Sequence, residues 1–208
     1  MATDTQPRAF RRALTWIFNP FHYLSGEPTL AFGLLALGIT GVVGSLSHIH
    51  VDGVLDVHIG PAAPLWFFIA EGLIDWLSLT LFVGIAGLLL SRSRLRLVDI
   101  AGMQALARAP QLVAVGLLAM VDPKCGGALF RATPTAECGV GAVTAFAVTL
   151  VVLIFAAVWT VSLMYRAFAV ACNVRGGPAI GAFVAALILA EVLSKILIVV
   201  LIQAAHVA

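Results

Sequence analysis

The stretch LWFFIAEGLIDWLSLTLFVGIAGLLL, from Leu65 to Leu90, decides the class of fold. It carries only two charges, Glu71 and Asp75, and is longer than the roughly 20 residues that a helix needs to cross a bilayer. The whole chain has the same character, with 62% hydrophobic and 11% charged residues. Soluble domains carry about 25% charged residues. The composition therefore excludes a soluble domain and indicates an integral membrane protein.

Five apolar runs of this kind predict an all-α, polytopic transmembrane helix bundle. The predicted spans are 30–47, 65–90, 98–121, 142–165 and 178–202. We read residues 1–208 as a single transmembrane domain, in which residues 1–28 form a cytoplasmic N-terminal segment. The third run is the least regular, because it contains Arg108 and Pro110. It also fits an interfacial helix followed by a shorter re-entrant piece.

The positions of lysine and arginine predict which way the bundle faces, because positively charged flanks stay on the cytoplasmic side. With the N-terminus inside, the cytoplasmic arginines are Arg8, Arg11, Arg12, Arg92, Arg94, Arg96, Arg166 and Arg175. The opposite side then holds only Lys124 and Arg131. An N-in, C-out topology follows. Because arginine outnumbers lysine and Ala and Gly are abundant, we expect a GC-rich bacterial source and an inner (cytoplasmic) membrane location.

A short interfacial amphipathic helix is predicted before the first span. The segment RRALTWIFNPFHY, from Arg11 to Tyr23, places aromatic residues beside basic ones, as helices that lie on a membrane surface do. Asn19 is expected to end this helix, because a residue before proline avoids helical angles. The same segment could instead be a docking surface for a cytosolic partner.

Three glycines on one side of the first predicted span indicate where another helix backbone approaches. Gly38, Gly41 and Gly44 recur along this span, and small residues at helical spacing let helices pack closely in a membrane. We expect this contact to lie within the chain rather than between two copies.

Ionisable residues inside the predicted spans are the most informative sign of function, because each costs at least about 2.5 kcal/mol at the bilayer centre. They are Glu71, Asp75, Arg108, Glu191 and Lys195. One interpretation is structural: Lys195 pairs with Glu191 or Asp75, and Arg108 pairs with Glu71 or Asp75. The other is functional, since a third, unmatched acid could mark a proton or ion pathway, or a polar substrate cavity.

The loop SHIHVDGVLDVHIG, from Ser47 to Gly60, carries a second cluster of ionisable side chains. Its members are His48, His50, Asp52, Asp56 and His58. Imidazole and carboxylate ligands suit zinc and similar transition metals, and alternate residues of an extended segment point the same way. Two other interpretations stay open, namely pH-responsive gating of the acidic second span and a purely structural loop. No other cofactor is expected.

Two cysteines fall on the same side of the membrane as this loop. Cys125 and Cys138 lie between the third and fourth predicted spans, in the compartment where disulfides form. A disulfide between them would stabilise the fold by about 3 kcal/mol in the chain-entropy estimate.

Three segments carry a resemblance to a known family. They are FNPFHYLSG at 18–26, VDGVLDVH at 51–58, and YRAFAVACNVRGGPAIGAFVAALILAEVLSK at 165–195. Together with five spans and the N-in topology, they resemble the bacterial members of the Yip1 family over most of the chain, from Trp16 to Ile202. The resemblance implies a non-enzymatic, polytopic membrane protein. The Asp-Leu-Tyr-Gly-Pro motif, which associates eukaryotic relatives with Rab-type GTPases, does not occur in this sequence, so no such role is expected.

These observations lead to three hypotheses about function. Neither Gly-x-Ser-x-Gly nor His-Glu-x-x-His occurs, so we do not expect an enzyme. The first hypothesis is a membrane-organising protein or assembly partner of Yip1 type, which contacts the lipid bilayer and a membrane-protein partner or a second copy, and no nucleic acid. The second is a small proton, ion or solute transporter that uses the five intramembrane charges. The third is an extracytoplasmic metal-binding membrane protein.

Overall fold

The computed structural model describes residues 6–121 and 140–205, which are mostly helical. Within this part, the helices long and apolar enough to cross a membrane are α2 (Gly26–Ser47), α3 (Leu65–Leu90), α7 (Val140–Ala171) and α8 (Gly177–Ala205). Their length and composition confirm the coarse prediction of a helical bundle in a multi-pass membrane protein. The ends of α3 coincide with the second predicted span, and the other three extend a few residues beyond their predicted limits.

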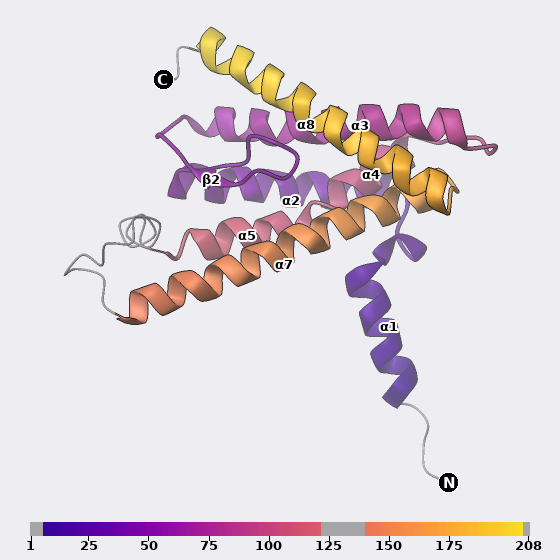
Figure 1. The fold of residues 1–208 in the computed structure, drawn as a ribbon, viewed down its shortest axis with the longest axis horizontal. Helices are drawn as coiled ribbons and strands as arrows, with labels where there is room; N and C mark the ends of the chain where they lie inside the picture. The colour runs from indigo at the N-terminus through magenta and orange to yellow at the C-terminus, as the bar shows by residue number, and fades with distance from the viewer. Residues whose placement is uncertain (1–5, 122–139, 206–208) are drawn as a thin grey trace.

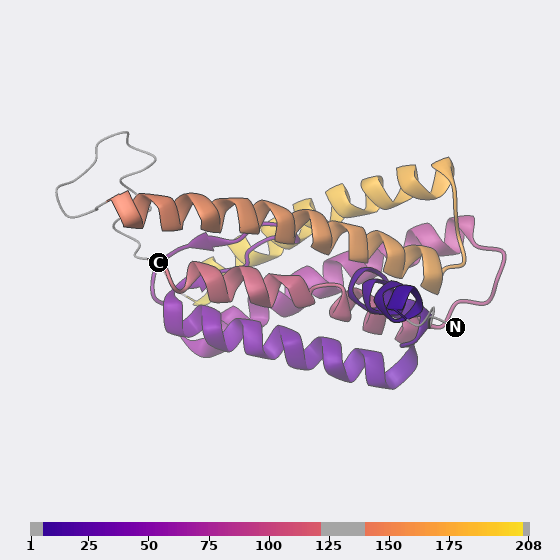
Figure 2. The same ribbon diagram turned by 90° about the horizontal axis from the view of Figure 1, so that it is seen from below.

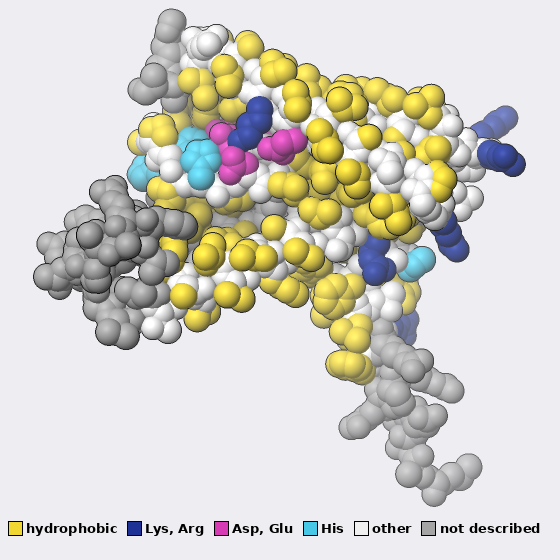
Figure 3. Space-filling model, viewed as in Figure 1, with side chains coloured by type: hydrophobic (Ala, Val, Ile, Leu, Met, Phe, Trp, Pro, Cys, Tyr) yellow, Lys and Arg dark blue, Asp and Glu magenta, His cyan; other side chains and the backbone are white. Residues whose placement is uncertain are grey.

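The long helices run lengthwise through the bundle, α3 and α7 in one direction and α2 and α8 in the other (Figures 1 and 2). We call one end of the bundle the loop end, because residues 48–64 join α2 to α3 there. The opposite end is the arginine end, where Arg92, Arg94 and Arg96 follow α3. Figure 3 shows Lys and Arg side chains at the arginine end, whereas acidic and histidine side chains gather around one basic side chain at the loop end. Charge is therefore separated along the bundle axis.

The third predicted span, 98–121, does not form one continuous helix. The segment forms two helices of 10 residues each, α4 (Leu97–Leu106) and α5 (Ala109–Leu118), which follow one another along the bundle (Figure 2). Pro110 lies in the first turn of α5, where its missing N–H is tolerated, whereas a helix running through it would lose a hydrogen bond. Each helix is about 15 Å long, which is half the thickness of the hydrocarbon core.

The N-terminal helix α1 (Gln6–Phe18) leaves the arginine end roughly at right angles to the bundle (Figure 1). It ends before Asn19, as predicted, and a short 3-10 turn, η1 (Pro20–His22), follows it before α2 begins. Its exposed apolar side chains include Phe10, Leu14 and Ile17. A perpendicular helix with an uncovered apolar face is typical of a helix that lies in the membrane interface.

An apolar core fills the half of the bundle nearest the arginine end. It is built from α3, α4, α7 and α8, and its buried side chains include Leu79, Val83, Ile100, Met103 and Phe168. Beside it, α2 packs closely on α4. A methyl group added at Gly33 would lie 2.5 Å from the backbone nitrogen of Leu106, so this approach requires glycine.

The connection between α2 and α3 folds into a short hairpin. Strand β1 (Ile49–His50) pairs antiparallel with β2 (His58–Ile59), and His50 lies opposite His58. The chain enters the hairpin at His48, which ends α2 in the left-handed conformation, with φ of 56°. The hairpin brings the ionisable residues of the loop onto α3 and α8.

Candidate functional site

His50 is docked against Glu71 inside the bundle and so joins the loop to α3. Its Nδ1 lies 2.8 Å from Oε1 of Glu71, and its Nε2 lies 2.9 Å from the carbonyl oxygen of Pro61. The two side chains are only 6% and 2% exposed. The ring of Phe68 stacks on the imidazole, with centroids 4.5 Å apart. A polar contact in apolar surroundings therefore fixes the loop to the second span.

The contact with Pro61 determines how many protons this pair holds. A carbonyl oxygen only accepts, so Nε2 of His50 carries a hydrogen. Either Nδ1 also carries one and Glu71 is ionised, or Glu71 is protonated and donates to Nδ1. In both cases one proton is shared between Nδ1 and Oε1. Burial lowers the pKa of His50, but the hydrogen bonds to Glu71 and Pro61 outweigh this effect and raise the pKa above its ordinary value.

A second buried pair joins α3 to the break between α4 and α5. Nη1 of Arg108 lies 4.0 Å from Oδ2 of Asp75 and donates to Oε1 of Gln111 at 3.3 Å. Arg108 is 4% exposed and Asp75 is fully buried. Neither carboxylate oxygen of Asp75 has a hydrogen-bond partner among the described residues, and the hydroxyl group of Ser194 on α8 donates to the carbonyl oxygen of Glu191 at 3.1 Å. Because Arg108 is the residue that precedes α5, the interruption of the helix is what carries this cation into the bundle.

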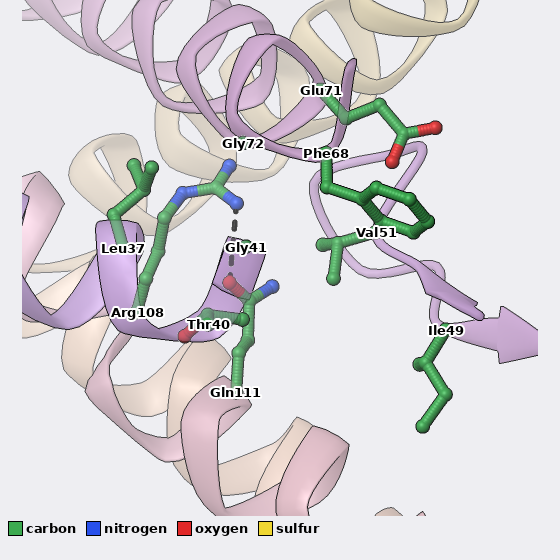
Figure 4. Close-up of a pocket in the computed structure, with 10 residues that line it drawn as sticks. All are labelled: Leu37, Thr40, Gly41, Ile49, Val51, Phe68, Glu71, Gly72, Arg108 and Gln111. Carbon is green, nitrogen blue, oxygen red and sulfur yellow. Dashed lines mark hydrogen bonds between the residues drawn. The ribbon is translucent and has the colours of Figure 1, made fainter. Parts of the chain in front are cut away.

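A cavity of about 20 Å³ lies between the two pairs. Glu71, Arg108 and Gln111 supply most of its polar lining (Figure 4). The carboxylate of Glu71 points away from the guanidinium group of Arg108 in Figure 4. Oε2 of Glu71 and Nη2 of Arg108 are both buried without a hydrogen-bond partner among the described residues. The cavity has room for about one water molecule and is far too small for an organic solute.

Lys195 pairs with the loop rather than with Glu191 or Asp75, so the predicted pairing is wrong. Its Nζ donates to Oδ1 of Asp52 at 3.0 Å and to Oδ2 of Asp56 at 2.6 Å. The cause is the hairpin, which presents both loop carboxylates to the outer face of α8. The hydrogen bond from Lys195 holds the pKa of Asp56 below its ordinary value, although partial burial opposes this effect.

Two further predicted site residues lie apart from these pairs. Glu191 accepts a long hydrogen bond of 3.4 Å from the backbone N–H of Leu55, so it too faces the loop. His48 is exposed at the end of α2 and does not belong to the group of loop ligands that the structure brings together.

Three of the five predicted metal ligands do converge, namely Asp52, Asp56 and His58. One ligand atom from each lies within 4.8 Å of the others, and Nδ1 of His58 is 3.3 Å from Oδ1 of Asp52. However, Nζ of Lys195 already bonds both carboxylates, so an ammonium group supplies the positive charge that a metal ion would bring. His50 is engaged by Glu71. Two carboxylates and one imidazole match a zinc ligand set only when Lys195 is displaced.

The comparisons with known proteins found no match for this chain among family models, curated proteins or solved structures. The resemblance to the Yip1 family rests on the three sequence segments and stays a prediction. The predicted disulfide also stays a prediction, because Cys125 and Cys138 lie outside the described residues.

Sequence reasoning identified the residues of the site but missed its central contact. His50 was grouped with the metal ligands and Glu71 with the intramembrane charges, and nothing in their spacing pairs them. One feature of the sequence could have suggested the contact. Glu71 lies near the start of the second span, which directly follows a loop that contains histidines.

Proposed function

We propose that the protein is a non-enzymatic, multi-pass inner-membrane protein of Yip1 type that organises the membrane or serves as an assembly partner of another membrane protein. The observation that carries the proposal is that the intramembrane charges are engaged in contacts that hold the fold together. The pairs are Glu71 with His50, Asp75 with Arg108, and Lys195 with Asp52 and Asp56. Each pair joins two segments that are distant in sequence, which is what a structural role requires.

The dimensions of the interior also favour a structural role over solute transport. The cavity beside Glu71 holds about 20 Å³, and the half of the bundle towards the arginine end is packed with apolar side chains. The buried ionisable groups, His50, Glu71, Asp75 and Arg108, therefore extend from the loop end only part of the way through the bundle. A solute would need a much larger cavity and a polar route on the other side.

In the proposed topology the chain crosses the membrane five times, with α4 and α5 forming one interrupted crossing. A broken helix is tolerated at membrane depth where the surrounding protein buries it, and α2, α3 and α7 all pack against this pair. The arginine end would face the cytoplasm, because it collects the basic residues. The N-terminus is then inside and the C-terminus outside.

A groove beside α7 offers a place where side chains of a partner helix would insert. It has a volume of about 260 Å³ and is lined by residues of the loop, α5 and α7. Ala114, Ala156 and Ala157 are among the lining residues, and small side chains let another helix backbone approach closely in a membrane. We take its occupant to be a transmembrane helix of the partner protein.

Co-purification from the native membrane in mild detergent tests this proposal. We expect a defined complex with a second protein, and we expect Ala157→Phe to release that protein because the ring fills the groove. Val158→Phe is the matched control, because Val158 is 61% exposed and lies outside the groove. A chain that purifies alone in every mild detergent contradicts the proposal, and so does a partner that both variants release equally. A complex made only of this chain would identify a homo-oligomer instead.

Proton transfer is the second candidate function, and the proton shared by His50 and Glu71 favours it. Glu71 and Arg108 line the same cavity, and buried acids and histidines form proton relays in membrane pumps. We call His50, Glu71, Asp75 and Arg108 together the polar network. If this network conducts protons, proteoliposomes that contain the protein should show proton flux, and Asp75→Asn must abolish it.

The metal-binding alternative requires Lys195 to leave Asp52 and Asp56. Elemental analysis of the purified protein, with and without Lys195→Met, measures this directly. We expect zinc to bind in the variant, where two carboxylates and His58 are left without the ammonium group, and not in stoichiometric amount in the unmodified chain. One zinc per unmodified chain would favour the metal hypothesis.

A further inference from the structure

A basic hollow lies at the arginine end, in the angle between α1 and α7. Its volume is about 620 Å³, which is in the range of small-molecule sites. Asn19 and His22 line it from η1 and the residue before it, and Tyr165, Arg166 and Arg175 line it from α7 and the turn that follows. Figure 3 shows Lys or Arg side chains and a histidine together where α1 leaves the bundle.

The cations of this hollow are not neutralised by the chain itself. Neither Arg166 nor Arg175 has a carboxylate within 4.0 Å in the part of the chain that the structure describes. This contrasts with Arg96, whose Nε lies 3.7 Å from Oδ2 of Asp99, and with Arg108, which faces Asp75. The hollow therefore attracts an anion.

Asn19 gives a second, independent sign of a ligand. The residue is only 9% exposed, yet its side-chain oxygen Oδ1 has no hydrogen-bond donor among the described residues. An unsatisfied buried amide oxygen costs free energy unless a partner approaches it. A ligand that carries both an anion and a hydroxyl group would satisfy the two arginines and Asn19 together.

The position of α1 says where such a ligand resides. The helix stands roughly perpendicular to the bundle axis, so it lies parallel to the membrane surface when the bundle spans it (Figures 1 and 2). The indole Nε1 of Trp159 on α7 donates to the carbonyl oxygen of Ile17 at 3.1 Å and holds the helix there. The exposed apolar face of α1 then enters the leaflet, which puts the hollow at the level of the lipid headgroups.

We propose that this hollow binds the headgroup of an anionic phospholipid, with Arg166 and Arg175 on the phosphate and the side chain of Asn19 turned so that its buried oxygen accepts from a headgroup hydroxyl. Phosphatidylglycerol has both groups. Basic pockets between transmembrane helices on the cytoplasmic side bind phospholipid headgroups in this way. The site goes beyond the proposed function and does not depend on it, because it lies at the opposite end of the bundle from the polar network.

Native mass spectrometry of the full chain, released from detergent micelles with added phosphatidylglycerol or phosphatidylcholine, tests the proposal. We expect one phosphatidylglycerol to be retained in preference to phosphatidylcholine. The double variant Arg166→Gln, Arg175→Gln should weaken this binding by about 30-fold, since each arginine near an anionic surface contributes about five-fold. The matched control is Arg94→Gln with Arg96→Gln, which removes the same charge at the same end of the bundle and outside the hollow. It should change binding by less than two-fold.

Three results would overturn the assignment. Equal retention of the two lipids would exclude an anion site, and this comparison needs no variant. If both double variants weakened binding equally, the lipid would be attracted by the overall positive charge of the arginine end and not by a site in the hollow. Glycerol 3-phosphate that competes at the same concentration as the lipid would identify a soluble phosphate ligand instead. Arg166→Lys with Arg175→Lys should retain most of the binding, which separates loss of charge from loss of fold.

Discussion

At the scale of single residues, the fold depends on a few charges that each contact an oppositely charged or hydrogen-bonding side chain. His50 and Glu71 share a proton under the hairpin, and Arg108 faces Asp75 below it. The sequence predicted which residues are unusual, because a charge in an apolar run stands out in any composition. It could not predict the pairs, since those depend on where the hairpin and the break before α5 place each side chain. Lys195 shows this most clearly, because its partners lie more than a hundred residues away.

The pH dependence of stability follows from His50. Its pKa is raised above the ordinary value of 6.5, so its protonated form stabilises the docked loop at acidic pH. This contribution is complete below about pH 6.5 and is lost as the pH rises through the raised pKa. We expect unfolding in detergent to become easier from pH 6 to pH 9 by about 1.5–3 kcal/mol, the value of a hydrogen bond to a charged group.

Two matched variants test whether the pH dependence of stability comes from the contact between His50 and Glu71. Glu71→Gln should flatten the pH profile, because its amide can donate to neutral Nδ1 of His50 at every pH. His58→Gln should leave the profile unchanged, since the side chain of His58 is 45% exposed. A profile that keeps its slope in Glu71→Gln, or a chain that becomes more stable as the pH rises, would show that His50 does not anchor the loop.

A double-mutant cycle measures the coupling between Asp75 and Arg108. Arg108→Gln leaves a buried acid without its cation and should cost about 3–5 kcal/mol of unfolding free energy. Adding Asp75→Asn should recover much of this cost, because neither charge then remains buried and unpaired. Denaturing-detergent titrations give the four free energies. Costs that simply add would mean that the 4.0 Å pair contributes no coupling.

At the scale of elements, the limits of the long helices could largely be predicted from the sequence. The interruption between α4 and α5 could be predicted only in part. Long apolar runs define α2, α3, α7 and α8, and the residue before Pro20 ends α1 as expected. The third run differs from the others in containing Arg108 and Pro110, and the helix breaks there. The glycine pattern was right in part. Gly41 and Gly44 meet α3 and the hairpin, whereas Gly38 has open space around it.

Alanine substitutions in α2 test how closely it packs on α4. The Cβ atom of Gly33→Ala would lie 2.5 Å from both Cβ of Ala105 and the nitrogen of Leu106, so we expect a loss of about 1–3 kcal/mol in unfolding free energy. Gly38→Ala is the control on the same helix, because no atom lies within 4 Å of its added methyl group. Equal effects of the two substitutions would be inconsistent with the observed contact between α2 and α4.

At the scale of the whole molecule, the bundle has two unlike ends and an apolar core between them. The loop end carries the polar network, and the arginine end carries the basic hollow and the interfacial helix. The positions of the arginines along the sequence predicted this asymmetry, because they alone distinguish the two ends. The central claim is that the polar network holds the fold together and does not conduct, since apolar side chains close it towards the arginine end.

Proton flux into proteoliposomes, driven by a pH gradient and a membrane potential, tests this claim most directly. The unmodified chain and the Asp75→Asn, Arg108→Gln double variant are reconstituted at equal, verified amounts of folded protein. We predict that neither exceeds the leak of protein-free liposomes at any pH between 5 and 9. Flux through the unmodified chain that disappears in the double variant would contradict the account and establish the network as a proton pathway.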